Sequence, residues 1–575
     1  MASTVYLDDF TRGLDTRRLS TATGPGALLV AHNVVIDSGG QVRKRYPLVL
    51  EYQLPDGAFG FRSVNGILTT WGSGPRPAAL PAIVAYVRLP HPTLPDLYPM
   101  TDVTCVRAFN GLPYVIATYL DNTVWHFYDG KPIFDWVSEP VTTLTALASA
   151  LARVIRANFP AYYATSAGPV LTVTGPLNTT FTLLASVTNR GTQPNAQPTV
   201  TVVQSATPAR PQIVRVELFG AYETEDRWSV TIGGIETGFV GLPVGVPTQV
   251  IVQDDFMYGW AGSTLFRCKL GDPTKWRSQL AEPSNTGAGS IFVTSHDNGS
   301  GDIVAAETLG DMLAIFTQRS TQLWKMDPDP VLNRRVTTIQ NMGSYAGAAV
   351  VGYIDGNVAF LSRQGIRTLR LGDDAVRATT DDIGTLIDEF VQNLLHGKSL
   401  AELARGTAVV DPREGRMILS IGTTALVFSY HPKSRVSAWT VWDLPVEAKY
   451  WIVQNDELLL YGIDRSVWSY AYREFDDTEA RVVLPAHDAK NPMAAKFWES
   501  MDIASEGRWR VYVHDDARTL TNPQLIGEME GTTFQKGAQA ISMESTGMIL
   551  EFRSVGSGKH VLSIAGLRHA KTKDD

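Results

Sequence analysis

The sequence predicts a mainly β protein, with a β-propeller, an inserted α+β domain and a C-terminal β-sandwich. Three observations lead to this prediction: a composition that favours strands, hairpin patterns at near-regular spacing, and one interruption with helical periodicity. Charged residues make up only 19% of the 575 residues, whereas Gly (49) and Pro (32) are abundant, and Thr and Val recur throughout. This composition favours turns and strands over helices.

Repeated hairpin patterns divide the second half of the chain into units. Each unit has a polar turn, an apolar run, a second turn and another apolar run, which is the pattern of a β-hairpin. Four units begin at Leu309, Ile354, Asp411 and Gln454, at spacings of 45, 57 and 43 residues. Propeller blades recur at roughly 40 to 50 residues and cover each other's faces. We therefore expect blades over residues 251–475, with an irregular β-sandwich of coincidental spacing as the alternative.

Earlier parts of the chain show the same pattern less regularly. One hairpin is expected at residues 109–131, and a weaker unit at residues 254–276. Residues 61–140 are therefore expected to form the first part of the propeller or a platform for it. An N-terminal arm with the first strands is expected over residues 1–60.

A different pattern interrupts the repeats over residues 141–250. Apolar residues recur there at helical spacing, and strand-like runs separated by Gly and Pro follow. The helical positions are Leu144, Leu147, Leu151, Ile155 and Phe159. We expect an inserted domain of one helix against hairpins. A second helix that ends in Gly is expected at residues 381–398, and a C-terminal β-sandwich at residues 476–575.

Motifs that could support catalysis fail on their spacing. The Gly-Lys pairs lack the upstream glycine of a phosphate-binding loop, and no HExxH pair or sialidase-type Asp box occurs. Cys105 and Cys268 have neither metal-site nor disulfide-framework spacing. We expect no catalytic residue, no metal and no cofactor. Two carboxylates of a glycosidase can be distant in sequence, so a propeller-type glycan hydrolase or lyase, or a carbohydrate-binding propeller, is the alternative function.

Four tryptophans lie in or beside the expected blades. They are Trp125, Trp324, Trp442 and Trp468. Such residues serve as sugar-stacking platforms in some proteins, but large aromatics also fill the space between packed sheets. We favour the core role.

The N-terminal sequence predicts neither secretion nor membrane anchoring. It has no basic segment followed by an apolar run, and no stretch of the chain approaches the ~20 apolar residues of a membrane span. We therefore expect no membrane anchor.

The stretch "GGQVRKRYP" (39–47) concentrates Arg43, Lys44 and Arg45 in a chain of net charge −8. With its surroundings, "FTRGLDTRRLS" and "AHNVVIDSGGQVRKRYP", it resembles the N-terminal signature of the tail tubular protein B family, the nozzle proteins of short-tailed bacteriophages. The matching residues are Gly13, Asn33, Gly40, Lys44, Arg45 and Pro47. The segments "LFRCKLGDPTKW" and "NMGSYAGAAVVGYIDGNVAFLSRQGIRTL" also resemble blade phrases of this family.

The resemblance implies a structural virion protein without enzymatic activity. It implies a homo-oligomeric ring of six copies below the tail adaptor, with tail fibres or spikes as further partners. The ring would be assembled in the host cytoplasm, lie in the virion tail and form the conduit for genome ejection. Double-stranded DNA would pass through the lumen without specific binding. The net charge of −8 is compatible with this, because a basic lumen would grip the phosphates.

The basic stretch then becomes the candidate contact with a neighbouring subunit or the adaptor. Strand alternation places Arg43 and Arg45 on one face and Lys44 on the other. The alternative is an edge strand that its charges protect against aggregation. The lumenal surface, by contrast, is expected to carry more Asp and Glu than Lys and Arg.

Overall fold

The computed structural model describes most of the chain. It covers residues 3–571 except 8, 19–21, 25, 93–94, 134, 136–142, 160, 189–196, 222–226, 241–245, 277–284, 294–300, 330–331, 354–355, 372–377, 382, 515–519, 521 and 534–536. Strands account for 55% of the described residues and helices for 7%, so the prediction of a mainly β protein is confirmed.

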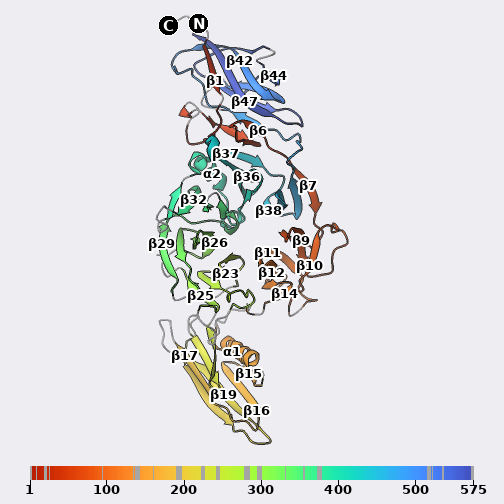
Figure 1. Ribbon diagram of the computed structural model, residues 1–575, viewed down its shortest axis with the longest axis vertical. Coiled ribbons are helices and arrows are strands. Elements are labelled where there is room, and N and C mark those ends of the chain that lie inside the picture. The colour runs from red at the N-terminus through yellow and green to blue at the C-terminus, as the bar shows by residue number, and fades with distance from the viewer. Residues whose placement is uncertain are drawn as a thin grey trace.

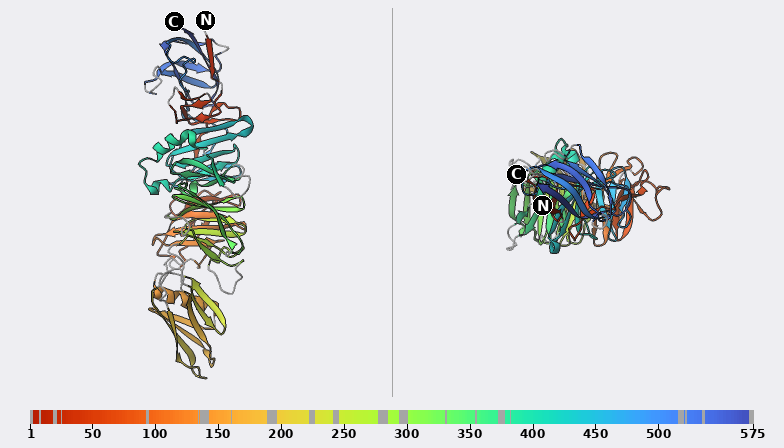
Figure 2. Two further views of the ribbon diagram at one scale, coloured as in Figure 1. Left: turned by 90° about the vertical axis from the view of Figure 1, so that its left-hand side faces the viewer. Right: turned by 90° about the horizontal axis from the view of Figure 1, so that it is seen from above.

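The molecule is elongated and has three parts along its long axis (Figure 1). Sheets that contain both termini lie at one end, and a group of seven sheets lies around a common centre in the middle. A module of one helix and two sheets occupies the other end. The side view in Figure 2 shows the same order along the axis.

The middle part consists of seven consecutive sheets, five of which are separate four-stranded antiparallel sheets. The first two sheets contain β8 (Phe59–Val64), β9 (Ile67–Gly72) and β10 (Ala85–Arg88), then β11 (Met100–Phe109), β12 (Leu112–Tyr119), β13 (Val124–Tyr128) and β14 (Lys131–Pro132). The third and fourth contain β22 (Val250–Gln253), β23 (Phe256–Ala261), β24 (Thr264–Arg267) and β25 (Gly289–Phe292), then β26 (Ile303–Leu309), β27 (Met312–Thr317), β28 (Ser320–Lys325) and β29 (Arg334–Gln340).

The fifth and sixth contain β30 (Val351–Tyr353), β31 (Asn357–Ser362), β32 (Gly365–Leu371) and β33 (Ala378–Asp381), then β34 (Thr407–Asp411), β35 (Arg416–Ile421), β36 (Thr424–His431) and β37 (Val436–Asp443). The seventh contains β38 (Ala448–Gln454), β39 (Glu457–Gly462), β40 (Ser466–Tyr470) and β7 (Leu48–Gln53). An N-terminal strand therefore completes the last sheet.

The first strands of these sheets contact one another in chain order. The contacts run from β8 through β11, β22, β26, β30 and β34 to β38, and β38 contacts β8. All six hairpins expected from the sequence are present as consecutive antiparallel strands. They are β12–β13, β23–β24, β27–β28, β31–β32, β35–β36 and β39–β40.

Both expected helices are present, but the second is shorter than the expected residues 381–398, because β33 ends at Asp381 and a 3-10 turn at Thr385–Ile387 precedes the α-helix. Helix α1 (Leu144–Asn158) is capped by the side chain of Thr143 and packs its apolar face into a core of its own. Helix α2 (Asp388–Leu395) is followed by Gly397, whose φ of 78° is the left-handed conformation that often ends a helix.

Helix α1 belongs to the module at one end of the molecule. Its partners are two antiparallel sheets. One contains β15 (Tyr163–Ala167), β16 (Val170–Leu177), β19 (Pro211–Phe219) and β18 (Gln197–Gln204), and the other contains β17 (Leu183–Thr188), β20 (Arg227–Ile232) and β21 (Ile235–Val240). The chain enters this module after β14 and returns to the middle part at β22. In the sequence, the module is therefore inserted between the second and third sheets of the middle part.

The opposite end combines strands from both termini. One sheet has the order β45 (Gln539–Ser545), β42 (Lys496–Glu506), β47 (Val561–Lys571), β6 (Val42–Lys44), β5 (Val34–Ile36), with β1 (Ser3–Leu7) paired to β47. The other has the order β4 (Val30–His32), β41 (Arg481–Val483), β46 (Ile549–Ser554), β43 (Arg508–His514), β44 (Gln524–Glu530).

This second sheet is continuous with a sheet of the middle part. Strand β4 pairs on its other side with β37, so the sixth sheet extends into the terminal part. Two short strands, β2 (Gly13–Leu14) and β3 (Ala27–Leu28), lie beside it. The N-terminal segment, expected to be an arm, is thus built into the terminal sheets and the last sheet of the middle part.

Candidate functional site

The basic stretch lies where the middle and terminal parts meet, and Arg45 is at its centre. Its side chain is 4% exposed. The guanidinium donates from Nε to Oδ1 of Asn33 at 3.0 Å, and from its terminal nitrogens to the carbonyl oxygens of Tyr46 at 2.8 Å and Asp443 at 3.0 Å. Arg45 thereby ties its own strand region to the end of β37.

Lys44 is buried on the other side of the same strand. Its Nζ donates to the carbonyl oxygens of Asp476 at 2.5 Å and Gly556 at 3.1 Å. Burial lowers the pKa of Lys44, and the nearby Asp476 and Asp477 carboxylates oppose that shift. Lys44 therefore joins β6 to two loops of the terminal part.

Arg43 completes the set with an ion pair. Its Nη2 donates to Oε1 of Glu414 at 2.8 Å, and its guanidinium lies 4.8 Å from the ring centre of Tyr46. Its side chain is 17% exposed. We call Asn33, Arg43, Lys44 and Arg45, with the groups they bond, the N-terminal joint.

The structure places Lys44 and Arg45 inside the chain, against the expected contact with a neighbouring subunit or the adaptor. Arg43, Lys44 and Arg45 all bond within their own chain. Lys44 is fully buried and Arg45 nearly so, which leaves neither side chain available to a partner. The physical reason is that short strands leave backbone carbonyl oxygens at their ends, and buried carbonyl groups need donors. Lys44 and Arg45 provide such donors, and Arg43 pairs with the Glu414 carboxylate.

The other residues of the N-terminal signature also have roles inside the chain. Asn33 has a φ of 53°, and its Nδ2 donates to Asp443 Oδ2 and to the carbonyl oxygen of Glu479, both at 3.2 Å. Gly13 lies so close to β37 that a Cβ would be 2.7 Å from the carbonyl oxygen of Trp439. The carbonyl oxygen of Pro47 accepts from the backbone N–H of Ala471 at 3.0 Å.

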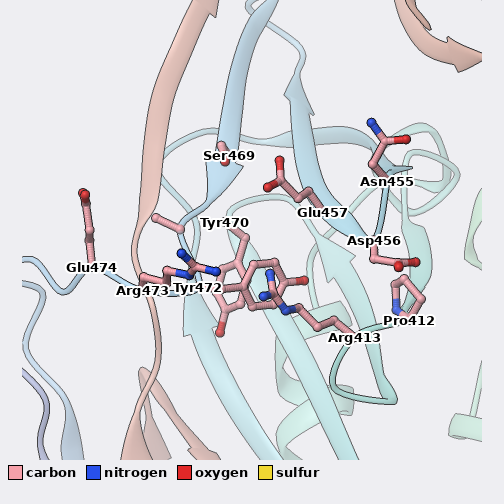
Figure 3. Close-up of a pocket in the computed structure, with 11 residues that line it drawn as sticks. Pro412, Arg413, Asn455, Asp456, Glu457, Ser469, Tyr470, Tyr472, Arg473 and Glu474 are labelled. Atoms are coloured by element: carbon pink, nitrogen blue, oxygen red, sulfur yellow. The ribbon is translucent and has the colours of Figure 1, made fainter. Parts of the chain in front are cut away.

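An open groove of about 660 Å³ adjoins the N-terminal joint (Figure 3). Its walls come from the β34–β35 turn, the β38–β39 turn and the segment after β40. Both signs of charge line it. The charged residues are Arg413, Arg473, Asp456, Glu457 and Glu474.

The aromatic floor of the groove is held by hydrogen bonding and stacking. The Tyr472 hydroxyl donates to Oδ1 of Asp411 at 2.9 Å, and the Arg413 guanidinium lies 4.5 Å from the Tyr472 ring centre. Figure 3 shows Arg413 reaching toward that ring. Burial raises the pKa of both Asp411 and Tyr472.

The groove does not offer the arrangement of a glycosidase. That chemistry uses one buried acid and a second carboxylate on either side of the scissile bond. The carboxylate residues that line the groove, Asp456, Glu457 and Glu474, are all exposed. The buried Asp411 already accepts the Tyr472 hydroxyl.

A second cavity lies at the centre of the seven sheets. We call this space of about 490 Å³ the axial cavity, because residues of all seven sheets line it. Its charged residues within the described part of the chain are Arg62 on β8, Arg107 on β11 and Glu307 on β26. A single lining carboxylate again does not match the two that glycosidases use.

The tryptophans considered as sugar platforms are largely in the core. Trp125, Trp324 and Trp442 are at most 7% exposed, which confirms the packing role. Trp468 is half-buried, and its Nε1 donates to the Ser466 hydroxyl at 2.8 Å.

The part of the chain that the structure describes holds neither a metal cluster nor a membrane-spanning helix. Within the described residues, no three His, Cys, Asp or Glu side chains gather closely enough to hold a metal ion. The helices in this part of the chain are all too short or too polar to cross a membrane. Cys105 and Cys268 are buried free thiols.

Comparisons with known proteins add little. No protein-family model matches the sequence, and no curated protein is similar to it. A heterotrimeric Nup82–Nup159–Nup145N complex from Chaetomium thermophilum matches at 12% identity and TM-score 0.19, over 31% of this chain and 41% of that one. A family 43 arabinoxylan arabinofuranohydrolase from Bacillus subtilis matches at 8% identity and TM-score 0.17, over 80% and 94%. Neither likeness is strong enough to support an argument about fold or function.

Proposed function

We propose that this chain is a structural subunit of the tail nozzle of a short-tailed bacteriophage. In this proposal, copies of the chain form a ring below the tail adaptor, bind fibres or spikes, and enclose the path of the ejected genome. The ring of six copies, these partners and the virion location come from the resemblance of the N-terminal signature. The chain has no enzymatic role in this proposal.

One observation supports the proposal most: three residues of the signature, Asn33, Lys44 and Arg45, belong to the N-terminal joint. Asn33, Lys44 and Arg45 join the middle part to loops and strands of the terminal part through hydrogen bonds between residues 398 to 512 positions apart in the sequence. Breaking buried charged contacts is costly, so such contacts favour one fixed arrangement. A conduit that must keep its shape during ejection needs this property.

We further propose that the seven sheets form a seven-bladed β-propeller. Support comes from the succession of contacts between the first strands, including the contact from β38 back to β8. The pairing of β7 with β40 supplies the last sheet with an N-terminal strand, which would fasten the circle. The terminal sheets would then form a sandwich-like end domain, and α1 with its sheets an inserted domain.

The alternative functions lack a supporting site. A glycan hydrolase or lyase needs catalytic groups that neither the groove nor the axial cavity offers among the described residues. A carbohydrate-binding propeller would expose aromatic platforms, but three of the four candidate tryptophans are buried.

Two measurements test the nozzle proposal. Native mass spectrometry of the purified chain should show a closed oligomer, expected at six times 62.8 kDa. Gold-labelled antibodies against the chain should bind the tails of phage particles that contain it. A stable monomer that cleaves glycans, or particles whose tails remain unlabelled, would contradict the proposal.

A further inference from the structure

We infer that the axial cavity binds a small oxyanion, a carboxylate or phosphate group, between Arg62 and Arg107. This site would be separate from the conduit role and does not depend on it. The inference is based on the positions of the two guanidinium groups, on the charges around them, and on the space beside them.

Arg62 is held at the cavity wall by two contacts. Its Nη1 donates to the carbonyl oxygen of Trp451 at 3.0 Å, and its guanidinium lies 3.6 Å from the ring centre of Tyr450. These contacts fix the plane of the group. Arg62 also lines a smaller neighbouring cavity of about 250 Å³, which shares lining residues with the axial cavity.

Arg107 lies on the neighbouring strand β11 and lines the same two cavities. Its Nε donates to the carbonyl oxygen of Val250 at 3.2 Å, while the side chain is exposed. Within the described residues, neither Arg62 nor Arg107 has a carboxylate oxygen within the 4.0 Å of an ion pair. Neither cation therefore forms an ion pair within this part of the chain.

The axial cavity carries a net positive charge, although the whole chain is negative. Two arginines and one glutamate line it, whereas the chain has a net charge of −8. Burial raises the pKa of Glu307, which weakens its tendency to neutralise Arg107. Burial lowers the pKa of Arg62, and the nearby Arg107 adds to that effect. An anion placed between the two guanidinium groups would offset both the cost of burying Arg62 and its repulsion by Arg107.

The cavity also has room for a ligand. Small residues from β26, β30, β34 and the 3-10 helix Gly347–Ala349 line it: Ala306, Gly347, Ala348, Gly352 and Ala408. A volume of about 490 Å³ falls in the range of roughly 300 to 1,000 Å³ typical of small-molecule sites. Arginine suits this task because its planar donors match two oxygens of a carboxylate or phosphate.

Titration calorimetry on the full chain at constant ionic strength tests the inference. The probes are inorganic phosphate and glucuronate, with glucose as the neutral control. We expect at least one anion to bind and glucose not to bind. Preference for glucuronate would indicate a sugar acid as the ligand class, and preference for phosphate would indicate a phosphate group.

Two variants with opposite expected signs make the test specific. Arg107→Gln should weaken anion binding about tenfold or more, because it removes a charged donor. Glu307→Gln should strengthen binding, because it removes the nearby negative charge. Arg334→Gln, an exposed arginine on the outermost strand β29, should leave binding unchanged. Circular dichroism would show that each variant is folded.

A soaked anomalous scatterer would locate the site directly. Crystals of the full chain exposed to selenate should show a peak between Arg62 and Arg107. The inference is overturned if neither anion binds, if folded Arg107→Gln binds as tightly as the unchanged chain, or if the selenate peaks all lie elsewhere.

Discussion

Arg45 shows at the scale of one residue why a basic cluster in an acidic chain can be structural. Its guanidinium donates to three acceptors inside the chain, the side-chain oxygen of Asn33 and the carbonyl oxygens of Tyr46 and Asp443. From the sequence, the cluster is expected to contact a neighbouring subunit or the adaptor, or to protect an edge strand against aggregation. The partners, Asp443, Asp476 and Gly556, are about 400 to 500 residues away, so the sequence alone had no signal for them.

Replacing Arg45 with Met should therefore destabilise the fold rather than block assembly. The carbonyl oxygens of Tyr46 and Asp443 would lose their Arg45 donor, and we expect the free energy of unfolding to fall by roughly 2 to 4 kcal/mol, because each buried acceptor left unsatisfied costs about 1 to 3 kcal/mol. Denaturant unfolding monitored by tryptophan fluorescence measures this. Arg334→Met is the exposed control and should change stability by less than about 0.5 kcal/mol.

The same reasoning applies to the charge reversal of Arg43 and Arg45 to Glu. We expect a chain that does not fold, since two carboxylates would face the acceptors that the guanidinium groups now satisfy. A folded, stable double variant that fails only in tail assembly would restore the interface role.

Glu551 provides a second test at the residue scale. It is fully buried and accepts from Arg481 Nε at 2.8 Å, Arg553 Nε at 2.6 Å and His514 Nε2 at 2.9 Å. Burial alone would raise its pKa, but these hydrogen bonds outweigh it and lower the pKa to about 2.

Because the folded-state pKa lies below the unfolded value of about 4.3, Glu551 stabilises the fold above pH 4.3. This contribution, about 3 kcal/mol, is lost as the pH falls from 4.3 toward 2. Glu551→Gln should lower Tm at pH 7 and flatten the decline of Tm over that window. Glu528 pairs with Arg510 in an exposed position, so Glu528→Gln is the control and should leave the decline of Tm with falling pH unchanged.

At the scale of elements, local sequence patterns predicted the elements that neighbouring residues form. The hairpins and both helices followed from turn residues and periodicity. Asn65–Gly66 joins β8 and β9 with a positive φ at both residues, and this signal could have located the first sheet as well. The pairing of N-terminal strands with distant segments could not be predicted in this way. Strands β4, β5 and β6 have three residues each, too few for a periodicity, and their partners come from distant segments.

Strand β7 closes the last sheet, and its two faces should respond differently to charge. Leu48 is 8% exposed and packs in the core beside Tyr470, whereas Val49 is 40% exposed. Leu48→Asp should cost several kcal/mol because it buries an unpaired carboxylate. Val49→Asp should cost less than about 1 kcal/mol. Equal stability losses in denaturant unfolding would contradict the observed orientation of β7.

The module around α1 should be removable. Its core contains residues from 147 to 232 and is separate from the other cores. A deletion must keep Pro247, whose carbonyl oxygen lies 2.8 Å from Nε2 of His126. We expect a chain with residues 141–245 replaced by a short Gly-Ser linker to remain soluble and to unfold cooperatively. Aggregation, or calorimetric unfolding without a cooperative transition, would show that the module supports the middle part.

At the scale of the whole molecule, net charge should govern contact with DNA. In a ring, the charge that each copy presents to the axis is multiplied by the number of copies, so a small acidic excess becomes a strong field. The basic stretch lies inside the N-terminal joint and therefore adds little positive charge to the surfaces that could line a DNA path through the proposed ring.

We therefore expect the assembled chain not to bind double-stranded DNA at physiological salt. Phosphate contacts supply most nonspecific affinity, and each one requires an exposed cation that releases a counterion. Fluorescence anisotropy of a labelled duplex at 50 and 200 mM salt measures this, with a basic DNA-binding protein as the positive control. Binding that weakens steeply between the two salt concentrations would instead place a basic surface along the conduit, and the expectation of an acidic lumen would be wrong.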